Sequence, residues 1–215
     1  MLKVEGVDVA IQAVQILRSV SLELPTGRMA GLIGRNGAGK TTLMKSIMGL
    51  LKVSGGAISF DDADLLAMPI HKRARMGIGY MPEDRRLIPD LTVEENLLLP
   101  AWAAKLSDAA ARLEKVYHLI PEIRGFAPRK GLQISGGQQK LVAIGRALMC
   151  GDKLLLLDEP FEGVAPALAH RIVEVVGDLK KEGMSMILSE SDLQHSERMA
   201  DQIIVIDRGV VSVRN

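Results

Sequence analysis

Short apolar runs bounded by Gly and Pro recur along the chain and predict the strands of a sheet. Residues 19–24 alternate between polar and apolar side chains, which is typical of a half-buried strand. Residues 29–33 are continuously apolar, as in a strand buried on both faces. From residue 153 the pattern alternates between strand and helix, which favours a mostly parallel sheet covered by helices. The helices expected there span 166–182 and 192–200, and the strands span 154–157, 184–188 and 203–206.

The middle of the chain has a helical pattern instead. Thr92 is followed three residues later by Glu95, a capping box that predicts the start of a helix running through 97–104. A second apolar stripe ends at Pro121, and a third helix is expected to begin near Ser135. We therefore expect one domain over 1–215. Its core with an N-terminal β-subdomain covers about 1–84 and 151–215, and an inserted helical subdomain covers about 85–150.

Composition and charge narrow the function classes. The chain of 215 residues is 47% hydrophobic and 25% charged, a globular balance. Its net charge of +1 argues against nucleic acid as a partner. No apolar stretch approaches the ~18 residues of a membrane span, and the N-terminus does not resemble a secretory signal. Cys150 is the only cysteine, so no internal disulfide is possible and a reducing cytoplasm fits. We expect Cys150 to be buried at a helix end.

A glycine-rich loop follows the strand at 29–33 and carries the clearest chemistry. Residues 34–41 match the phosphate-loop pattern, with a strand before and a helix after. Backbone N–H groups of such a loop bind phosphates, its Lys reaches the β- and γ-phosphates, and its Ser or Thr hydroxyl contacts Mg²⁺. ATP and Mg²⁺ are the expected ligands. The predicted nucleotide-binding residues are Gly34, Arg35, Asn36, Gly37, Ala38, Gly39, Lys40, Thr41 and Thr42.

Two carboxylates end the apolar run at 154–157. Asp158 and Glu159 are expected at the C-terminal edge of a buried strand, where open α/β sheets bind ligands. Asp158 is predicted to hold Mg²⁺ through water, and Glu159 to act as the general base that polarises an attacking water. Taken alone, this sequence is also compatible with an exposed turn.

The residues Ser135, Gly136, Gly137 and Gln138 lie between these two motifs in the sequence. Taken alone, they are an ordinary capped helix start. Two glycines lower the stability of the first helical turn, however. Their presence indicates that a function requires exposed backbone at this position. Exposed N–H groups, a hydroxyl and a helix dipole form an anion site, although the chain already has one.

The three motifs in this order resemble the nucleotide-binding subunit of ABC transporters, over essentially the whole chain. The resemblance implies a P-loop cassette with a mostly parallel core sheet, an N-terminal antiparallel β-subdomain and an inserted α-helical subdomain. It also implies that two cassettes pair, so that Ser135, Gly136, Gly137 and Gln138 form a signature acting in trans on the γ-phosphate held by the other chain. The partners implied are a homologous ATPase subunit, as a homodimer or heterodimer, and two polytopic membrane permeases. The chain would then be cytoplasmic and peripheral on the inner face of the membrane.

Longer strings narrow the resemblance to one branch. Residues 81–86, 91–97, 143–149 and 158–166 are similar to the second ATPase subunit of branched-chain amino-acid importers. Importers of amides, urea or aromatic acids share these strings. A groove near Glu83 is the expected seat of the permeases, and Pro89, Leu91 and Trp102 are candidates for that contact, with Trp102 expected in the core.

Three positions depart from the general family pattern. Glu83 stands where a Gln usually bridges Mg²⁺ and the membrane subunits, and we expect Glu83 to ligate Mg²⁺ too. Ser191 stands where a His commonly contacts the γ-phosphate; we count it with Glu159 and Lys40 as catalytic, although a hydroxyl is shorter and never cationic. Ile11 stands where an aromatic residue stacks on adenine. We expect His195 to be a solvated residue on a helix face.

Other function classes remain as alternatives. The departures at Ile11 and Ser191 favour a weakly hydrolysing module that binds ATP in an asymmetric dimer. A soluble ABC ATPase of DNA repair or translation is disfavoured, because the chain has neither a coiled-coil insertion nor a second cassette. A GTPase is disfavoured by the lack of a guanine-recognition motif.

Overall fold

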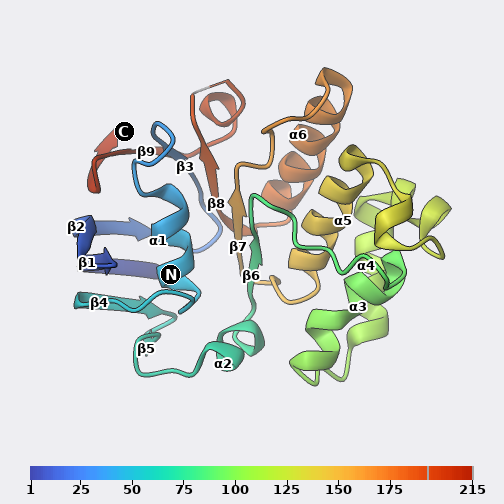
Figure 1. Ribbon diagram of the computed structural model, residues 1–215, viewed down its shortest axis with the longest axis horizontal. Helices are drawn as coiled ribbons and strands as arrows, with labels where there is room; N and C mark the ends of the chain where they lie inside the picture. The colour runs from blue at the N-terminus through green and yellow to red at the C-terminus, as the bar shows by residue number, and fades with distance from the viewer. Residues whose placement is uncertain (193, 215) are drawn as a thin grey trace.

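In the computed structural model, which describes residues 1–192 and 194–214, the strands form an antiparallel sheet and a mostly parallel sheet (Figure 1). The first sheet has the order β2-β1-β4-β5, and the second has the order β10-β9-β3-β8-β7-β6. The strands are β1 (Leu2–Ile11), β2 (Val14–Leu24), β3 (Met29–Ile33), β4 (Gly55–Phe60), β5 (Ala63–Asp64), β6 (Ile78–Met81), β7 (Leu154–Asp158), β8 (Ser185–Glu190), β9 (Gln202–Asp207) and β10 (Val210–Arg214). The helices are α1 (Lys40–Ile47), α2 (Ile70–Arg75), α3 (Val93–Ala103), α4 (Ala109–Leu119), α5 (Gly136–Leu148) and α6 (Pro166–Lys181), with 3₁₀ turns η1 (Pro121–Phe126), η2 (Gly131–Gln133) and η3 (Ser196–Arg198).

The second sheet has helices on both faces. Strands β9, β3, β8, β7 and β6 run parallel, and only β10 is antiparallel to its neighbour. Leu154 and Leu156 pack in the core that includes α1 and the first sheet, whereas Leu155 and Leu157 pack with α5 and α6. This two-sided burial explains why the β7 sequence is continuously apolar. The expected α/β fold class is confirmed.

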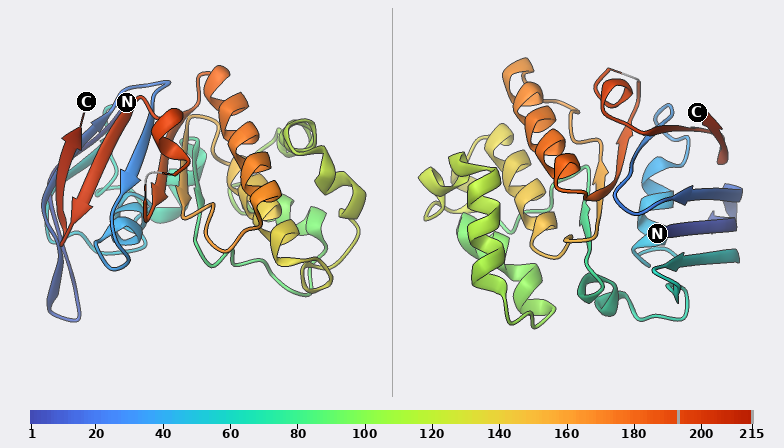
Figure 2. Two further views of the ribbon diagram at one scale, coloured as in Figure 1. Left: turned by 90° about the horizontal axis from the view of Figure 1, so that it is seen from above. Right: turned by 180° about the vertical axis from the view of Figure 1, so that it is seen from behind.

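The antiparallel sheet and the helices α3 and α4 lie at opposite ends of the molecule (Figure 2). Thr92 caps α3 with the expected capping box: its hydroxyl accepts the N–H of Glu95 at 3.1 Å, and the Glu95 carboxylate accepts the N–H of Thr92 at 2.7 Å. The helices between residues 93 and 148 fall within the range assigned to the helical subdomain. The division of the chain into a core and a subdomain stays a prediction.

The helix expected over 192–200 is wrong. Leu193 lies outside the described residues, and the described part contains only η3. The buried Glu190 carboxylate explains the difference, because one oxygen accepts the N–H of Ser196 at 2.8 Å and the other lies 3.1 Å from Nδ1 of His195. These bonds fold the segment back onto the end of β8 and compete with the helical i→i−4 pattern.

Asp201 joins three elements at the opposite end of the parallel sheet from the phosphate loop. Its carboxylate accepts the N–H of Met29 at 2.8 Å and lies 3.0 Å from the ammonium of Lys180 and 3.3 Å from the guanidinium of Arg28. Burial alone raises the pKa of Asp201, but the bond from Met29 and the two cations outweigh it and hold the pKa below its usual value.

We expect Asp201→Ala to lower the free energy of unfolding by about 1–3 kcal/mol at pH 7, because the Met29 N–H loses its acceptor. The depressed pKa means that this stabilisation is present above the unfolded pKa and is lost as pH falls through the folded pKa. Urea unfolding at pH 7 and pH 3.5 checks this, with the difference between variant and wild type shrinking at acid pH. An equal difference at both pH values would contradict the carboxylate's role.

Candidate nucleotide-binding site

The phosphate loop connects β3 to α1, as expected. Gly39 has a φ of 119° and lies against Leu17, where an added Cβ would come within 2.8 Å of the Leu17 side chain. No other residue fits this conformation and this space, so the loop passes tightly over β2. The loop exposes Asn36 and Gly37, while Ala38 is buried.

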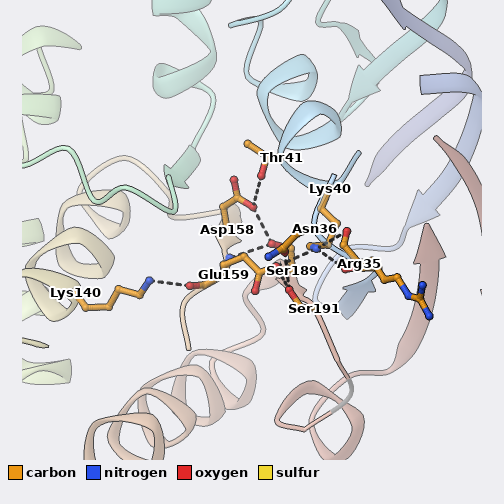
Figure 3. Close-up of polar contacts among 10 residues, drawn as sticks. Arg35, Asn36, Lys40, Thr41, Lys140, Asp158, Glu159, Ser189 and Ser191 are labelled. Atoms are coloured by element: carbon orange, nitrogen blue, oxygen red, sulfur yellow. Dashed lines mark hydrogen bonds and ion pairs between the residues drawn. The ribbon is translucent and has the colours of Figure 1, made fainter. Parts of the chain in front are cut away.

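Lys40 lies at the first position of α1 with its side chain only 5% exposed. Its ammonium donates to the carbonyls of Gly34 and Arg35 and lies 3.0 Å from Oε1 of Glu159. Figure 3 shows this ammonium beneath the loop, pointing toward Glu159. The lysine predicted for phosphate binding and the carboxylate predicted as base therefore meet directly.

Asp158 ends β7 and is fully buried, held by three hydroxyl groups. Its Oδ1 accepts from Thr41 at 3.1 Å and from Ser189 at 2.8 Å, and its Oδ2 accepts from Tyr80 at 3.2 Å. Burial raises the pKa of Tyr80, and the Asp158 charge raises it further, so the phenol stays a neutral donor. The sequence reasoning missed Tyr80 and Ser189, which reach the site because β6 and β8 flank β7.

Glu159 follows directly and has a left-handed backbone with a φ of 49°. Its N–H donates to the Ser189 hydroxyl at 3.0 Å, and its Oε1 accepts from the Ser191 hydroxyl at 2.9 Å. Its carbonyl accepts from the ammonium of Lys140 at 2.7 Å. This backbone turn lets Asp158 and Glu159 present both carboxylates to the phosphate loop, whereas adjacent strand residues point to opposite faces.

Two cavities lie beside the loop and share Glu83. One of about 370 Å³ is lined by Ile16, Asn36, Gly37, Gly39, Lys40, Thr41, Thr42, Glu83 and Glu159. The other, of about 130 Å³, is lined by Thr41, Lys45, Tyr80, Pro82, Glu83, Asp84 and Asp158. Burial raises the pKa of Glu83, and the neighbouring Glu162 and Asp158 raise it further.

The remaining loop residues face elsewhere. Gly34, Arg35 and Ala38 line a separate crevice, together with residues 205–208 of β9 and the turn that follows it. Ile11 is 39% exposed at the end of β1 and is not among the residues lining the three cavities beside the phosphate loop. Ile16 instead lines the cavity of about 370 Å³. No pattern in the sequence distinguishes Ile16 from other strand residues.

Ser191 lies between Asn36 and Glu159, with its oxygen 2.9 Å from Oδ1 of Asn36 and from Oε1 of Glu159. A hydroxyl has one hydrogen, so it donates to the carboxylate and the Asn36 amide in its other orientation can donate to it. His195 was expected to be solvated on a helix face, which is wrong. Its ring is 27% exposed, bonds to Glu190 and stacks on Phe161 at 4.1 Å between centroids.

The signature residues begin α5 at a distance from the loop cavities. Ser135 is the N-cap, its hydroxyl accepting the N–H of Gln138 at 3.3 Å. Ser135 and Gly136 are exposed, and none of residues 135–138 is among the residues lining the three cavities that contain the phosphate loop. Phosphate loop and signature are therefore two separate surfaces of one chain. Cys150, as expected, is buried just after α5.

Comparison with known proteins decides the family, because residues 17–162 match the ABC transporter family. The chain belongs to the ABC transporter family. It is an ATP-binding subunit and an ABC-type ATPase. The ABC cassette is 36% identical, over 97% of its length and 90% of the other protein, to the high-affinity branched-chain amino acid transport ATP-binding protein BraG of Pseudomonas aeruginosa.

The cassette is also similar to an ATPase with a different use. It is 32% identical, over 98% of its length and 88% of the other protein, to the lipopolysaccharide export system ATP-binding protein LptB of Haemophilus influenzae. Among solved structures, it superposes on an ATP-binding subunit of an ABC transporter with a TM-score of 0.88 at 31% identity, covering 100% of this chain and 90% of that one. A dimeric bacterial cassette, MJ0796, gives a TM-score of 0.89 at 25% identity, covering 100% and 98%.

Proposed function

We propose that this cassette powers an importer of branched-chain or related amino acids, by hydrolysing ATP between two chains. The observation that carries the two-chain part is the separation of the exposed signature from the loop cavities of the same chain. A signature that cannot serve its own nucleotide needs another chain. The importer branch is supported by the similarity to BraG over 97% of the chain.

The residues around the loop have complementary tasks in this proposal. The loop N–H groups and Lys40 bind the β- and γ-phosphates. Glu159 accepts a proton from the attacking water. The single hydrogen of the Ser191 hydroxyl bonds to Glu159 in this structure and would turn to the γ-phosphate or to that water when nucleotide is bound. Catalysis comes mainly from positioning and charge stabilisation, because phosphoryl transfer needs little covalent chemistry from the protein.

Mg²⁺ fits the oxygen atoms that converge between the loop and β7. No group of three or more His, Cys, Asp or Glu side chains in the described part of the chain is arranged to hold a metal alone. Mg²⁺ is instead typically bound by one or two carboxylates with waters and substrate phosphates. Thr41 and Asp158, 3.1 Å apart, would hold the ion, with Glu83 on the wall of the same cavity. Bound Mg²⁺ would neutralise charge developing on the phosphates.

The partners in this proposal are a homologous cassette and two membrane permeases. No helix in residues 1–192 and 194–214 is long and apolar enough to cross a membrane. In this proposal, binding to the permeases places the chain peripherally on the cytoplasmic face. Trp102 was expected in the core, which is wrong, since it is 52% exposed. Ile88 and Leu132 are also exposed, and these three side chains are candidates for the permease contact near Glu83, in addition to Pro89 and Leu91.

Two alternatives have specific support. The 32% identity to LptB favours an export ATPase that uses the same cassette chemistry. Ser191, whose side chain is shorter than the usual histidine, and Ile11, which is aliphatic where an aromatic residue is usual, favour a weakly hydrolysing subunit in an asymmetric dimer. Amides, urea and aromatic acids remain alternative solutes.

Reconstitution distinguishes these uses. We expect the cassette and its co-purified permeases, in proteoliposomes with the cognate solute-binding protein, to take up labelled leucine in an ATP-dependent way. Lys40→Ala should abolish this uptake, because the phosphate-binding ammonium is lost. ATP-driven extraction of lipopolysaccharide without leucine uptake would overturn the importer assignment in favour of export.

A further inference from the structure

A buried lysine outside the three motifs contacts the predicted catalytic glutamate. Lys140 lies in α5 with only 3% of its surface exposed, and its ammonium donates to the carbonyl of Glu159 at 2.7 Å. Figure 3 shows the Lys140 side chain extended from α5 toward Glu159, on the side of Glu159 opposite to Lys40. The carbonyl thus connects the helix that begins with the signature to the end of β7.

Burial of this ammonium is expensive and incompletely compensated. None of the ion pairs found within 1–192 and 194–214 includes Lys140. Burial lowers the pKa of Lys140, and the Arg85 guanidinium lowers it further. The carboxylates of Glu162, Glu83 and Glu159 oppose this shift without outweighing it. A methionine would fill similar space without this cost, so packing alone does not explain a lysine here.

The Lys140 side chain contacts the backbone of Glu159, which has an uncommon conformation. Glu159 is a non-glycine residue in the left-handed region, a conformation retained only where its surroundings hold it. Ser189 of β8 accepts its N–H, and Lys140 of α5 donates to its carbonyl. The Glu162 N–H donates to the same carbonyl at 3.2 Å, which closes the local turn. Without Lys140, the Glu159 carbonyl would keep only the bond from Glu162, and the turn would lose its connection to α5.

We propose that Lys140 is a positioning residue for Glu159, holding its backbone so that the carboxylate stays against Lys40 and linking that carboxylate to the signature helix of the same chain. The inference rests on the proposed function, in which Glu159 is the base. Because Ser135, the N-cap of α5, lies five residues before Lys140, a nucleotide contacted by this signature acts through one rigid helix on Glu159 at the chain's own site. Lys140 then connects the two ATP sites of a dimer.

The test uses the full chain and three variants. Lys140→Met removes the donor at similar volume, and Lys140→Arg keeps a cationic donor. Lys180→Met is the matched control, because the Lys180 ammonium also donates to a backbone carbonyl, that of Met199 at 2.5 Å, far along α6 from the loop cavities. Each is assayed for steady-state ATPase kcat, for affinity toward Mg²⁺ and a non-hydrolysable ATP analogue, and for thermal unfolding.

We expect Lys140→Met to lower kcat about tenfold or more, the scale of a lost charge-assisted hydrogen bond, with analogue affinity changed less than about twofold. Its melting temperature should not fall, since a buried charge is removed. Lys140→Arg should recover part of kcat, and Lys180→Met should keep it. In a Glu159→Gln background, Lys140→Met should cause no further loss, because both changes act through one carboxylate.

Three results would overturn the role of Lys140: an unchanged kcat in Lys140→Met, equal losses of kcat and analogue affinity, or an additive loss on top of Glu159→Gln. These differ from failure of the proposed function itself. If the wild-type chain hydrolyses ATP and Glu159→Gln does too, the base assignment fails and the inference with it. If Glu159→Gln is inactive and Lys140→Met is fully active, only the inference fails.

Discussion

Glu159→Gln is expected to lower the ATPase kcat by at least about 100-fold, the scale of losing a general base. Gln is nearly isosteric, and its carbonyl oxygen can still accept from Lys40 and Ser191, which lie 3.0 and 2.9 Å from Oε1 in the wild type. What it cannot do is accept a proton from water. ATP affinity should therefore change little, and the variant should accumulate as an ATP-bound dimer in size-exclusion chromatography.

A surface control separates chemistry from general damage. Glu174→Gln makes the same chemical change on the exposed face of α6, where the side chain is 65% exposed, and should hydrolyse ATP at the wild-type rate. Hydrolysis by Glu159→Gln at a rate within about threefold of wild type would contradict the base assignment.

Ser135→Arg should have the second large effect, and that effect should appear at the other chain's nucleotide. The variant places a bulky cation where the exposed hydroxyl and bare glycine backbone would contact a γ-phosphate. Hydrolysis should fall about 100-fold, as when one preorganised donor is lost, while ATP affinity of the separate chain stays unchanged. The reason is that Ser135 is not among the residues lining the loop cavities of its own chain.

Mixing variants tests this assignment in trans. If the chain forms homodimers, a dimer of one Ser135→Arg chain and one Lys40→Ala chain has one intact site, made of the first chain's phosphate loop and the second chain's signature. Random mixing puts about half of the dimers in this form, and each has one active site of two. The mixture should therefore recover about a quarter of wild-type activity. Neither variant alone should be active. Thr92→Ala is the matched control, since it removes a capping box from α3 and should cost about 1 kcal/mol of stability without loss of hydrolysis. No recovery on mixing would contradict a signature that acts in trans.

The local elements were largely predictable, because their signals are short-range. The expected strand at 29–33 matches β3. Thr92 and Ser135 cap helices at the expected positions, since a capping box is a contact between residues three apart. The helix expected over 192–200 failed because Glu190, a buried carboxylate at the end of a strand, takes the Ser196 N–H. A propensity pattern contains no information about that competition.

The sequence by itself determined the chemistry available at this site: a phosphate loop, two carboxylates after a buried strand, and a capped Ser-Gly-Gly helix start. Only the tertiary structure decided how these groups meet. Lys40 contacts Glu159, and Tyr80, Ser189 and Lys140 join the site from β6, β8 and α5. The physical reason is that each motif is made of residues close together in the sequence. Tyr80, Ser189 and Lys140 reach the site instead through the register of neighbouring strands and the packing of α5, which join residues far apart along the chain.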